Sequence, residues 1–215
     1  MSRPYDAVLF DFGGVFTDSP FGAFEDAARE LGADPREVLE IVFGPYDLDT
    51  DHPWHRLERG ELGLAEARSA IIALGQERGV SLDPLQVLAR MSGGSGAREG
   101  LVVRTRTLRR EGYKTALVTN NAREFRASWR PLLPLDELFD AVVDSSEVGM
   151  RKPNPAIFHH ALAAVGGVPA ARSIFLDDHP GNIAAARRIG MQGVLVGDDP
   201  AEALGALERL LRGGD

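Results

Sequence analysis

The chain has 215 residues, which is enough for one domain with an inserted module and for a substantial buried core. Apolar residues make up 44% and charged residues 26%, and the net charge is −8; this composition disfavours both global disorder and nonspecific nucleic-acid binding, which needs a basic surface. The chain has no cysteine, so disulfides, thiolate nucleophiles and cysteine-bound zinc are excluded.

The first apolar run, Ala7–Phe10, is too short for a signal peptide or a membrane helix, and no apolar run of the required length follows it. We therefore expect a soluble, cytoplasmic protein that contacts neither membrane nor nucleic acid. The sequence does not indicate an oligomeric state.

Five short apolar runs have the length and composition of strands. They lack the alternation of half-buried strands, which indicates burial on both faces of a sheet. Helical patterns separate the later runs, and this order predicts an α/β fold with a Rossmann-like, three-layer core built on a parallel sheet. The expected strands are 7–10, 115–118, 141–143, 174–176 and 193–196, and the expected core helices are 101–111, 155–165, 183–189 and 201–211.

The stretch between the first strand and the next core helix has helical patterns and no convincing strand. We interpret residues 18–95 as a helical cap inserted into a core made of residues 1–17 and 96–215. Ser92–Gly96 has the composition of a flexible linker, on which a cap can rock. The expected cap helices are 21–31, 35–42, 64–78 and 84–90.

Polar residues follow four of the expected strands. In an open parallel sheet, ligands bind beyond the carboxyl ends of the strands, so these residues are expected to meet in one pocket. They are Asp11 after the first strand, Thr119 and Asn120 after the second, Lys152 beyond the third, and Asp177 and Asp178 after the fourth.

This set of groups suits phosphate chemistry. A carboxylate such as Asp11 can be a nucleophile toward phosphorus or carbon. Crowded carboxylates repel one another, and Mg²⁺ would offset this because it binds carboxylates together with substrate phosphate. Lys152 can neutralise a phosphate or hold Asp11 ionised, and Thr119 can donate to phosphate oxygens. Gly13 and Gly14 let the backbone turn sharply beside the nucleophile.

With these motifs, the chain resembles the haloacid dehalogenase (HAD) superfamily of hydrolases over nearly its whole length. Any one motif is weak evidence, but four in order, each after an expected strand, are strong evidence. The subgroup looks similar to the phosphatase-like domain of soluble epoxide hydrolases and its bacterial relatives. The four matching motifs are Asp11, Thr119-Asn120, Lys152 and Asp177-Asp178.

The resemblance implies a Mg²⁺-dependent phosphatase of a small phosphorylated metabolite. Asp11 would attack the phosphoryl group and form an aspartyl-phosphate, which water then hydrolyses. The implied metal ligands are Asp11, the Gly13 carbonyl, Asp177 and Asp178, and the implied phosphate-binding residues are Gly14, Thr119, Asn120 and Lys152.

One departure from the family pattern concerns Gly13. HAD phosphatases usually carry a second Asp at this position, as general acid and base, and losing such a group typically costs about 10²–10⁴ in rate. Three interpretations follow. The first is a phosphatase in which a cap residue, a water or a good leaving group replaces the missing acid; His52 and His55 are the candidate proton donors of the cap, and the alternative for their segment is a solvated loop. The others are a metal-independent 2-haloacid dehalogenase and a non-catalytic phosphate-binding scaffold. The retained acidic pair favours the first.

Residues near these motifs leave further alternatives open. Asn182 either orients the acidic pair or only begins the next helix, and His179 is expected in an exposed turn. Trp54 is the cap aromatic that we expect to be able to line a substrate pocket. Among small phosphorylated metabolites, we favour a sugar phosphate as the substrate, because an anomeric sugar phosphate needs less acid catalysis to lose its leaving group.

Overall fold

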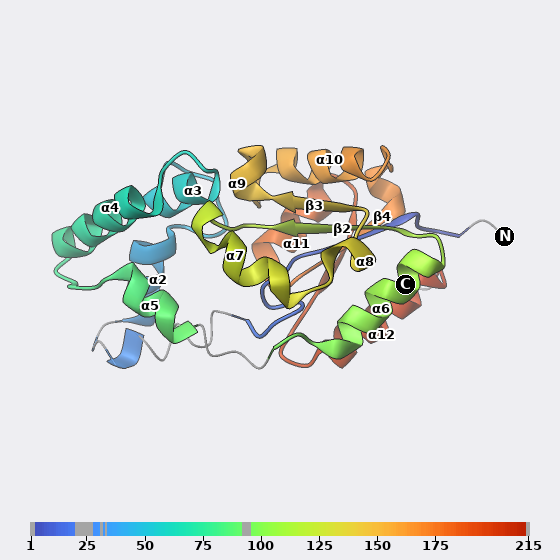
Figure 1. Ribbon diagram of the computed structural model, residues 1–215, viewed down its shortest axis with the longest axis horizontal. Helices are drawn as coiled ribbons and strands as arrows, with labels where there is room; N and C mark the ends of the chain where they lie inside the picture. The colour runs from blue at the N-terminus through green and yellow to red at the C-terminus, as the bar shows by residue number, and fades with distance from the viewer. Residues whose placement is uncertain (1–2, 20–27, 31, 33, 92–95, 214–215) are drawn as a thin grey trace.

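The computed structural model shows a three-layer α/β core with a group of helices at one end (Figure 1). The sheet lies between two helical layers, and its strands point their carboxyl ends toward that group of helices. The structure describes residues 3–19, 28–30, 32, 34–91 and 96–213.

The sheet in this part of the chain has five parallel strands in the order β3-β2-β1-β4-β5. The first strand is central, and all residues of β1 and β4 are buried, as the run of apolar residues without alternation predicted. The strands are β1 (Ala7–Phe10), β2 (Lys114–Thr119), β3 (Ala141–Asp144), β4 (Ser173–Asp177) and β5 (Gln192–Leu195).

Helices cover both faces of the sheet, which confirms the predicted α/β class. Helices α6 (Glu99–Arg110) and α12 (Pro200–Leu211) pack on one face, and α10 (Pro155–Ala164) and α11 (Pro180–Arg188) pack on the other (Figure 1). Three short helices that the sequence analysis missed lie in the connections. They are α7 (Arg126–Trp129), α8 (Leu135–Leu138) and α9 (Ser145–Val148).

Local capping explains where α10 begins. The Asn154 side chain accepts a hydrogen bond from the Ala156 amide at 3.0 Å, and Pro155 occupies the first helical position, where a missing N–H has no cost. Asp199 caps α12 in the same way, through the Ala201 amide at 2.9 Å. These caps place the loops before both helices at the carboxyl edge of the sheet.

Four helices between β1 and α6 form a unit with its own apolar core, which we call the helical cluster (α2–α5, residues 35–91). Its core includes Ile41, Trp54 and Leu57. Helix α3 was not expected. The four helices are α2 (Pro35–Phe43), α3 (Pro53–Glu58), α4 (Leu64–Glu77) and α5 (Pro84–Met91).

The limits of the inserted segment stay a prediction. Of the expected helix 21–31, residues 28–30 are helical, and the rest lies outside the described residues. Ser92–Ser95 of the expected linker lie outside them too.

A buried ion pair joins the helical cluster to the core. Arg151 Nε lies 2.7 Å from Glu58 Oε2, and both side chains are almost completely buried. Arg151 also donates through Nη1 to the Leu48 carbonyl at 2.7 Å, and Asn154 donates to Asp49 at 3.1 Å. Because an unpaired buried charge is costly, these contacts hold the cluster in a defined position over the sheet.

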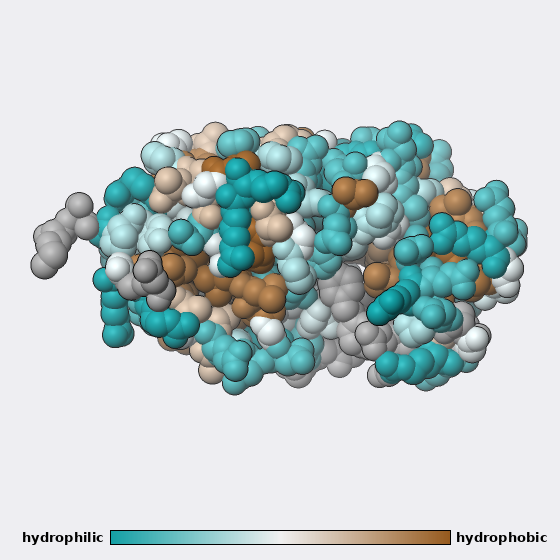
Figure 2. Space-filling model, turned by 180° about the vertical axis from the view of Figure 1, so that it is seen from behind, coloured by the Kyte–Doolittle hydropathy of each residue, from teal (hydrophilic) through white to brown (hydrophobic). Residues whose placement is uncertain are grey.

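The surface is mixed in character. Hydrophilic residues dominate the face opposite to that in Figure 1, and hydrophobic residues gather between them in places (Figure 2). Among the described residues, the large hydrophobic side chains with the greatest exposure include Leu48, Val103, Leu132 and Leu195. No helix in the described part of the chain combines the length and the hydrophobicity that a membrane span requires.

Candidate active site

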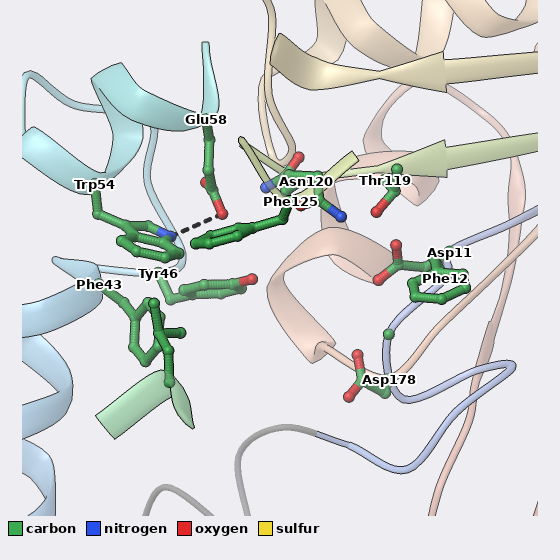
Figure 3. A pocket seen from close by; sticks show the side chains of 13 residues that line it. Asp11, Phe12, Phe43, Tyr46, Trp54, Glu58, Thr119, Asn120, Phe125 and Asp178 are labelled. Carbon is green, nitrogen blue, oxygen red and sulfur yellow. Dashed lines mark hydrogen bonds between the residues drawn. The ribbon is translucent and has the colours of Figure 1, made fainter. Parts of the chain in front are cut away.

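A cavity of about 220 Å³ lies between the carboxyl edge of the sheet and the helical cluster (Figure 3). The strand ends supply its polar side, and the cluster supplies most of its aromatic side. The lining residues are Asp11, Phe12, Gly13, Phe43, Tyr46, Trp54, Glu58, Leu88, Thr119, Asn120, Asn121, Phe125 and Asp178.

Asp11 stands at the end of the central strand β1. Its amide donates to the Leu176 carbonyl at 2.8 Å, which continues the β1–β4 pairing by one residue and fixes the Asp11 backbone. Its side chain is mostly buried and lies at the cavity, with Oδ1 2.7 Å from Lys152 Nζ. Asp11 is thus held by the sheet on one side and by an ammonium group on the other.

Lys152 bridges two carboxylates. Its Nζ lies 2.8 Å from Asp177 Oδ2 as well as 2.7 Å from Asp11 Oδ1, and its side chain is 1% exposed. Burial alone would lower the pKa of Lys152, but the two carboxylates outweigh it and raise the pKa above its ordinary value. Lys152 therefore stays charged and neutralises the strand ends.

Asp177 is saturated with hydrogen bonds from the protein. Besides Lys152, it accepts from the His179 amide at 2.8 Å and lies 3.1 Å from Asn182 Nδ2 through each oxygen. It does not line the cavity. Asn182 therefore orients Asp177 and also lies in the first turn of α11, so both alternatives that the sequence left open apply to it.

Asn120 holds the backbone that carries Lys152. Its Oδ1 accepts from the Lys152 amide at 2.8 Å, and its Nδ2 donates to the Lys152 carbonyl at 2.9 Å. The family resemblance implies phosphate binding by Asn120; the residue lines the cavity, and both ends of its side-chain amide are engaged with Lys152. Thr119, which precedes it at the end of β2, lines the cavity as expected.

Asp178 is the second carboxylate that faces the cavity, and Gly14 makes its position possible. Gly14 has φ +68°, and a Cβ there would lie 1.9 Å from Asp178 Oδ2. Gly14 does not line the cavity; its missing side chain leaves the space that the Asp178 carboxylate occupies. Ser19, which the sequence analysis missed, donates to Asp178 Oδ2 at 2.6 Å.

The acidic group fits a divalent cation. Carboxylate oxygens of Asp11, Asp177 and Asp178 all lie within 4.8 Å of one another, a donor set of the hard oxygens that Mg²⁺ prefers. Burial raises the pKa of Asp11 above its ordinary value, and burial followed by the charge of Asp177 raises the pKa of Asp178 to about 6. The three carboxylates thus need more positive charge than Lys152 supplies.

Neither of the two cap histidines lies at the cavity; His55 is buried and His52 is half-buried. His52 Nδ1 accepts from the Trp54 amide at 3.2 Å and caps α3, and His55 Nδ1 accepts from the Thr50 amide at 3.1 Å. Neither lines the cavity, and neither sits in the solvated loop that was the alternative. Burial lowers the pKa of His52 to about 4 and that of His55 to about 3.

Most residues that the sequence analysis missed come from the helical cluster or its contacts. Tyr46, Glu58 and Phe125 line the cavity without belonging to any motif. Trp54 was identified as a possible pocket residue, and it does line the cavity. His179 is not in an open turn: its ring lies 4.7 Å from the Tyr46 ring, at the junction of core and cluster. The sequence alone does not show whether an aromatic residue of a helical segment lines a pocket or packs in a core.

Comparison with known proteins gives a consistent family assignment. A family model for haloacid dehalogenase-like hydrolases matches residues 5–190. The sesquiterpene phosphatase astK of Aspergillus oryzae is 26% identical over 95% of this chain and 96% of its own length. Phosphatase MT3486 of Mycobacterium tuberculosis is 30% identical, with coverage of 88% and 86%. Acyl-CoA dehydrogenase family member 10 of Mus musculus is 30% identical over 97% of this chain, which spans only 19% of that relative.

Solved structures show the same fold. A HAD-like family hydrolase from Porphyromonas gingivalis has a TM-score of 0.64 and 25% identity, with coverage of 97% of this chain and 98% of the other. A HAD family enzyme of Bacteroides thetaiotaomicron, solved with magnesium and inorganic phosphate, has a TM-score of 0.61 and 20% identity over 92% and 98%. At the latter identity, the likeness concerns the fold alone.

Replacing Gly14 by Ala should disrupt the acidic group, because the new Cβ would displace the Asp178 carboxylate. We expect calorimetric titration with MgCl₂ to show an affinity at least about tenfold weaker, in line with the effect of disturbed metal-site geometry. The control is Gly79→Ala, which has a similar φ of +74° and nothing within 4 Å of its Cβ. If both variants bind Mg²⁺ like the parent, the acidic group does not bind the ion.

The two cap histidines should make the protein less stable as the pH falls. The unfolded chain takes up a proton at each near pH 6.5, whereas the folded chain does so only near pH 4 for His52 and pH 3 for His55, so the free energy of unfolding decreases below pH 6.5. In urea unfolding, His55→Asn should reduce the loss between pH 7.5 and 5 by about 2 kcal/mol. His159→Asn, at an exposed position of α10, should leave that loss unchanged.

Proposed function

This chain belongs to the haloacid dehalogenase-like hydrolases, and we propose that it is a phosphatase that hydrolyses monophosphate esters through a phosphoaspartate on Asp11. The observation that carries the proposal is the pairing of Asp11 with Lys152 at 2.7 Å, beside the cavity-facing Asp178. The phosphatase names of two relatives matched over most of their length support it.

In the first step, Asp11 attacks phosphorus. Lys152 binds Oδ1, which favours the ionised carboxylate, and we assign the attack to Oδ2. A new O–P bond forms on Asp11 while the bond from phosphorus to the alcohol oxygen breaks, and that oxygen takes up a proton as it leaves. Thr119, at the end of β2, is placed to donate to the transferring phosphoryl oxygens. Water then attacks phosphorus and releases inorganic phosphate from Asp11.

The ligands that we propose for Mg²⁺ are Asp11, Asp178 and the Gly13 carbonyl. Asp177 is the third carboxylate of the acidic group and lies beside them. When bound, Mg²⁺ supplies positive charge that stabilises the phosphoryl oxygens in the transition state. Asp177 has a second task, because its contact with Lys152 fixes the ammonium group beside Asp11. Asn120 supports both by clamping the Lys152 backbone.

Tyr46 is the proton donor that we propose in place of the Asp missing at position 13. Its side chain extends from the helical cluster across the cavity toward Asp11 (Figure 3). Burial raises the pKa of Tyr46 well above its ordinary value, and the charge of Glu58 adds to this, so the hydroxyl stays protonated. A neutral O–H there can donate to the leaving oxygen, and the water consumed in the second step restores the proton.

The substrate on this proposal is a small phosphorylated metabolite. The cavity volume limits the size of the ester that can bind between the sheet and the helical cluster. The acidic group, with the Mg²⁺ proposed there, would bind the phosphate. A cytoplasmic location stays a prediction from the cysteine-free sequence.

Replacing Asp11 by Asn should abolish turnover because the amide cannot form the phosphoaspartate. We expect the parent enzyme to release phosphate from at least one monoester of a panel only with MgCl₂, and Asp11→Asn to lose at least about 10³-fold in kcat/KM. Asp198→Asn, in an exposed loop before α12, is the control and should keep parental activity.

Other results of that panel would point elsewhere. Phosphate release by Asp11→Asn at the parental rate would exclude Asp11 as the nucleophile. Halide release from 2-haloacids without metal would identify a dehalogenase, and silence of the parent in both assays would favour a phosphate-binding scaffold.

Tyr46→Phe should lower the rate of hydrolysis most for those esters whose leaving oxygen needs a proton. We expect kcat for an alkyl phosphate to fall about 10–10²-fold, and kcat for p-nitrophenyl phosphate to change less than about threefold, since nitrophenolate leaves without a proton. Tyr113→Phe, outside the cavity, should affect neither. Equal losses with both esters would show that Tyr46 only shapes the pocket.

A further inference from the structure

We infer that the alcohol part of the substrate is an apolar hydrocarbon of about the size of one six-membered ring, and not a sugar. This inference rests on the proposed phosphatase function and deepens it. It replaces the leaning toward a sugar phosphate, which rested on the leaving group alone and not on any contact in the cavity.

The cavity has two chemically different sides (Figure 3). The strand ends carry the groups for phosphate and metal, among them Asp11, Thr119 and Asp178. The opposite wall is formed by aromatic and aliphatic side chains together with the carboxylate of Glu58. Its apolar members are Phe43, Tyr46, Trp54, Leu88 and Phe125.

Packing holds this wall in place. The Trp54 and Phe43 rings meet edge to face at 4.9 Å, and Tyr46 packs edge-on against Phe43 at 6.4 Å. A guanidinium, that of Arg151, lies over the Tyr46 ring at 5.7 Å. The aromatic surface is therefore preorganised for an apolar group and gains little from rearranging around a polar one.

The polar groups on this wall already have protein partners. Glu58 accepts from Trp54 Nε1 at 2.9 Å through one oxygen and from Arg151 Nε at 2.7 Å through the other. Both the indole N–H and the carboxylate are thus engaged, and the hydroxyl of Tyr46 is the group that we assign to the leaving oxygen. The ring hydroxyls of a sugar would lose their hydrogen bonds to water on binding against this wall and would not find equivalent partners there. That loss costs binding free energy.

The volume sets the size of the apolar group. An apolar cavity of about 150 Å³ holds one benzene ring. The cavity that the described residues line has a volume of about 220 Å³, which leaves room for a phosphoryl group beside one ring or a branched chain of similar bulk. We therefore commit to a compact hydrocarbon and not to a long acyl chain.

Two matched esters test the inference directly. Cyclohexylmethyl phosphate and glucose 6-phosphate are both primary alkyl esters attached to a six-membered ring, so their leaving groups have similar demands and the ring polarity differs. With the parent enzyme and MgCl₂, we expect kcat/KM to be at least about 10²-fold higher for the cyclohexyl ester. Calorimetry with Asp11→Asn and MgCl₂ should show the same order of affinities without turnover.

A variant of the wall locates the effect. Leu88→Asn places an amide of similar size on the apolar wall and should lower the ratio of the two kcat/KM values about tenfold. Leu85→Asn is the matched control, because Leu85 is half-buried on the same helix, α5, but does not line the cavity. It should leave the ratio unchanged even if it lowers stability.

The outcomes separate this inference from the function on which it rests. Preference for glucose 6-phosphate, or equal kcat/KM for the two esters, would overturn the apolar assignment while the phosphatase stands. Equal changes of the ratio in the two leucine variants would show that the wall does not read the alcohol. Hydrolysis of neither ester, with no binding to Asp11→Asn, would overturn the inference, and activity on other monoesters would then show whether the phosphatase proposal survives.

Discussion

The site depends on a single buried ammonium group. Lys152 lies between Asp11 at the end of β1 and Asp177 at the end of β4, and without it two carboxylates would face each other in a nearly dry environment. Three elements converge to place it: the pairing of the two central strands, the hydrogen bonds of Asn182 to Asp177, and the clamp of Asn120 on its backbone. The sheet therefore positions charges as well as packing the core.

The core was predictable because its signals are local. Short apolar runs followed by polar residues identified five strands, and strand ends in a parallel sheet share one edge, so Asp11, Asp178 and Thr119 could be brought together before any coordinates. The roles of individual side chains were less predictable. The family resemblance implied a phosphate ligand at Asn120, whereas its side-chain partner, Lys152, lies 32 residues further along the chain. Only the fold reveals that its amide is already engaged.

The helical cluster was harder to interpret from sequence. Its helices were largely expected, except for α3, whose six residues begin at Pro53 and are capped by His52. Apolar residues at helical spacing indicate a buried face but do not tell whether it packs against protein or encloses a ligand. Trp54 does both: its ring belongs to the apolar core of the cluster and also lines the cavity. That ambiguity is physical, since the same aromatic surface serves both purposes.

The neighbouring residues Arg151 and Lys152 divide their attachments between the two parts of the molecule. Arg151 is anchored to Glu58 and to the Leu48 carbonyl of the helical side, whereas Lys152 is anchored to the strand ends. One peptide unit thus connects the aromatic wall of the cavity to the ammonium group beside Asp11. A helical cluster taken from a relative would fit this core only if it supplied a carboxylate for Arg151 in place of Glu58. Because Arg151 adjoins Lys152, a change of the cluster that moved Arg151 would also move the ammonium group beside Asp11.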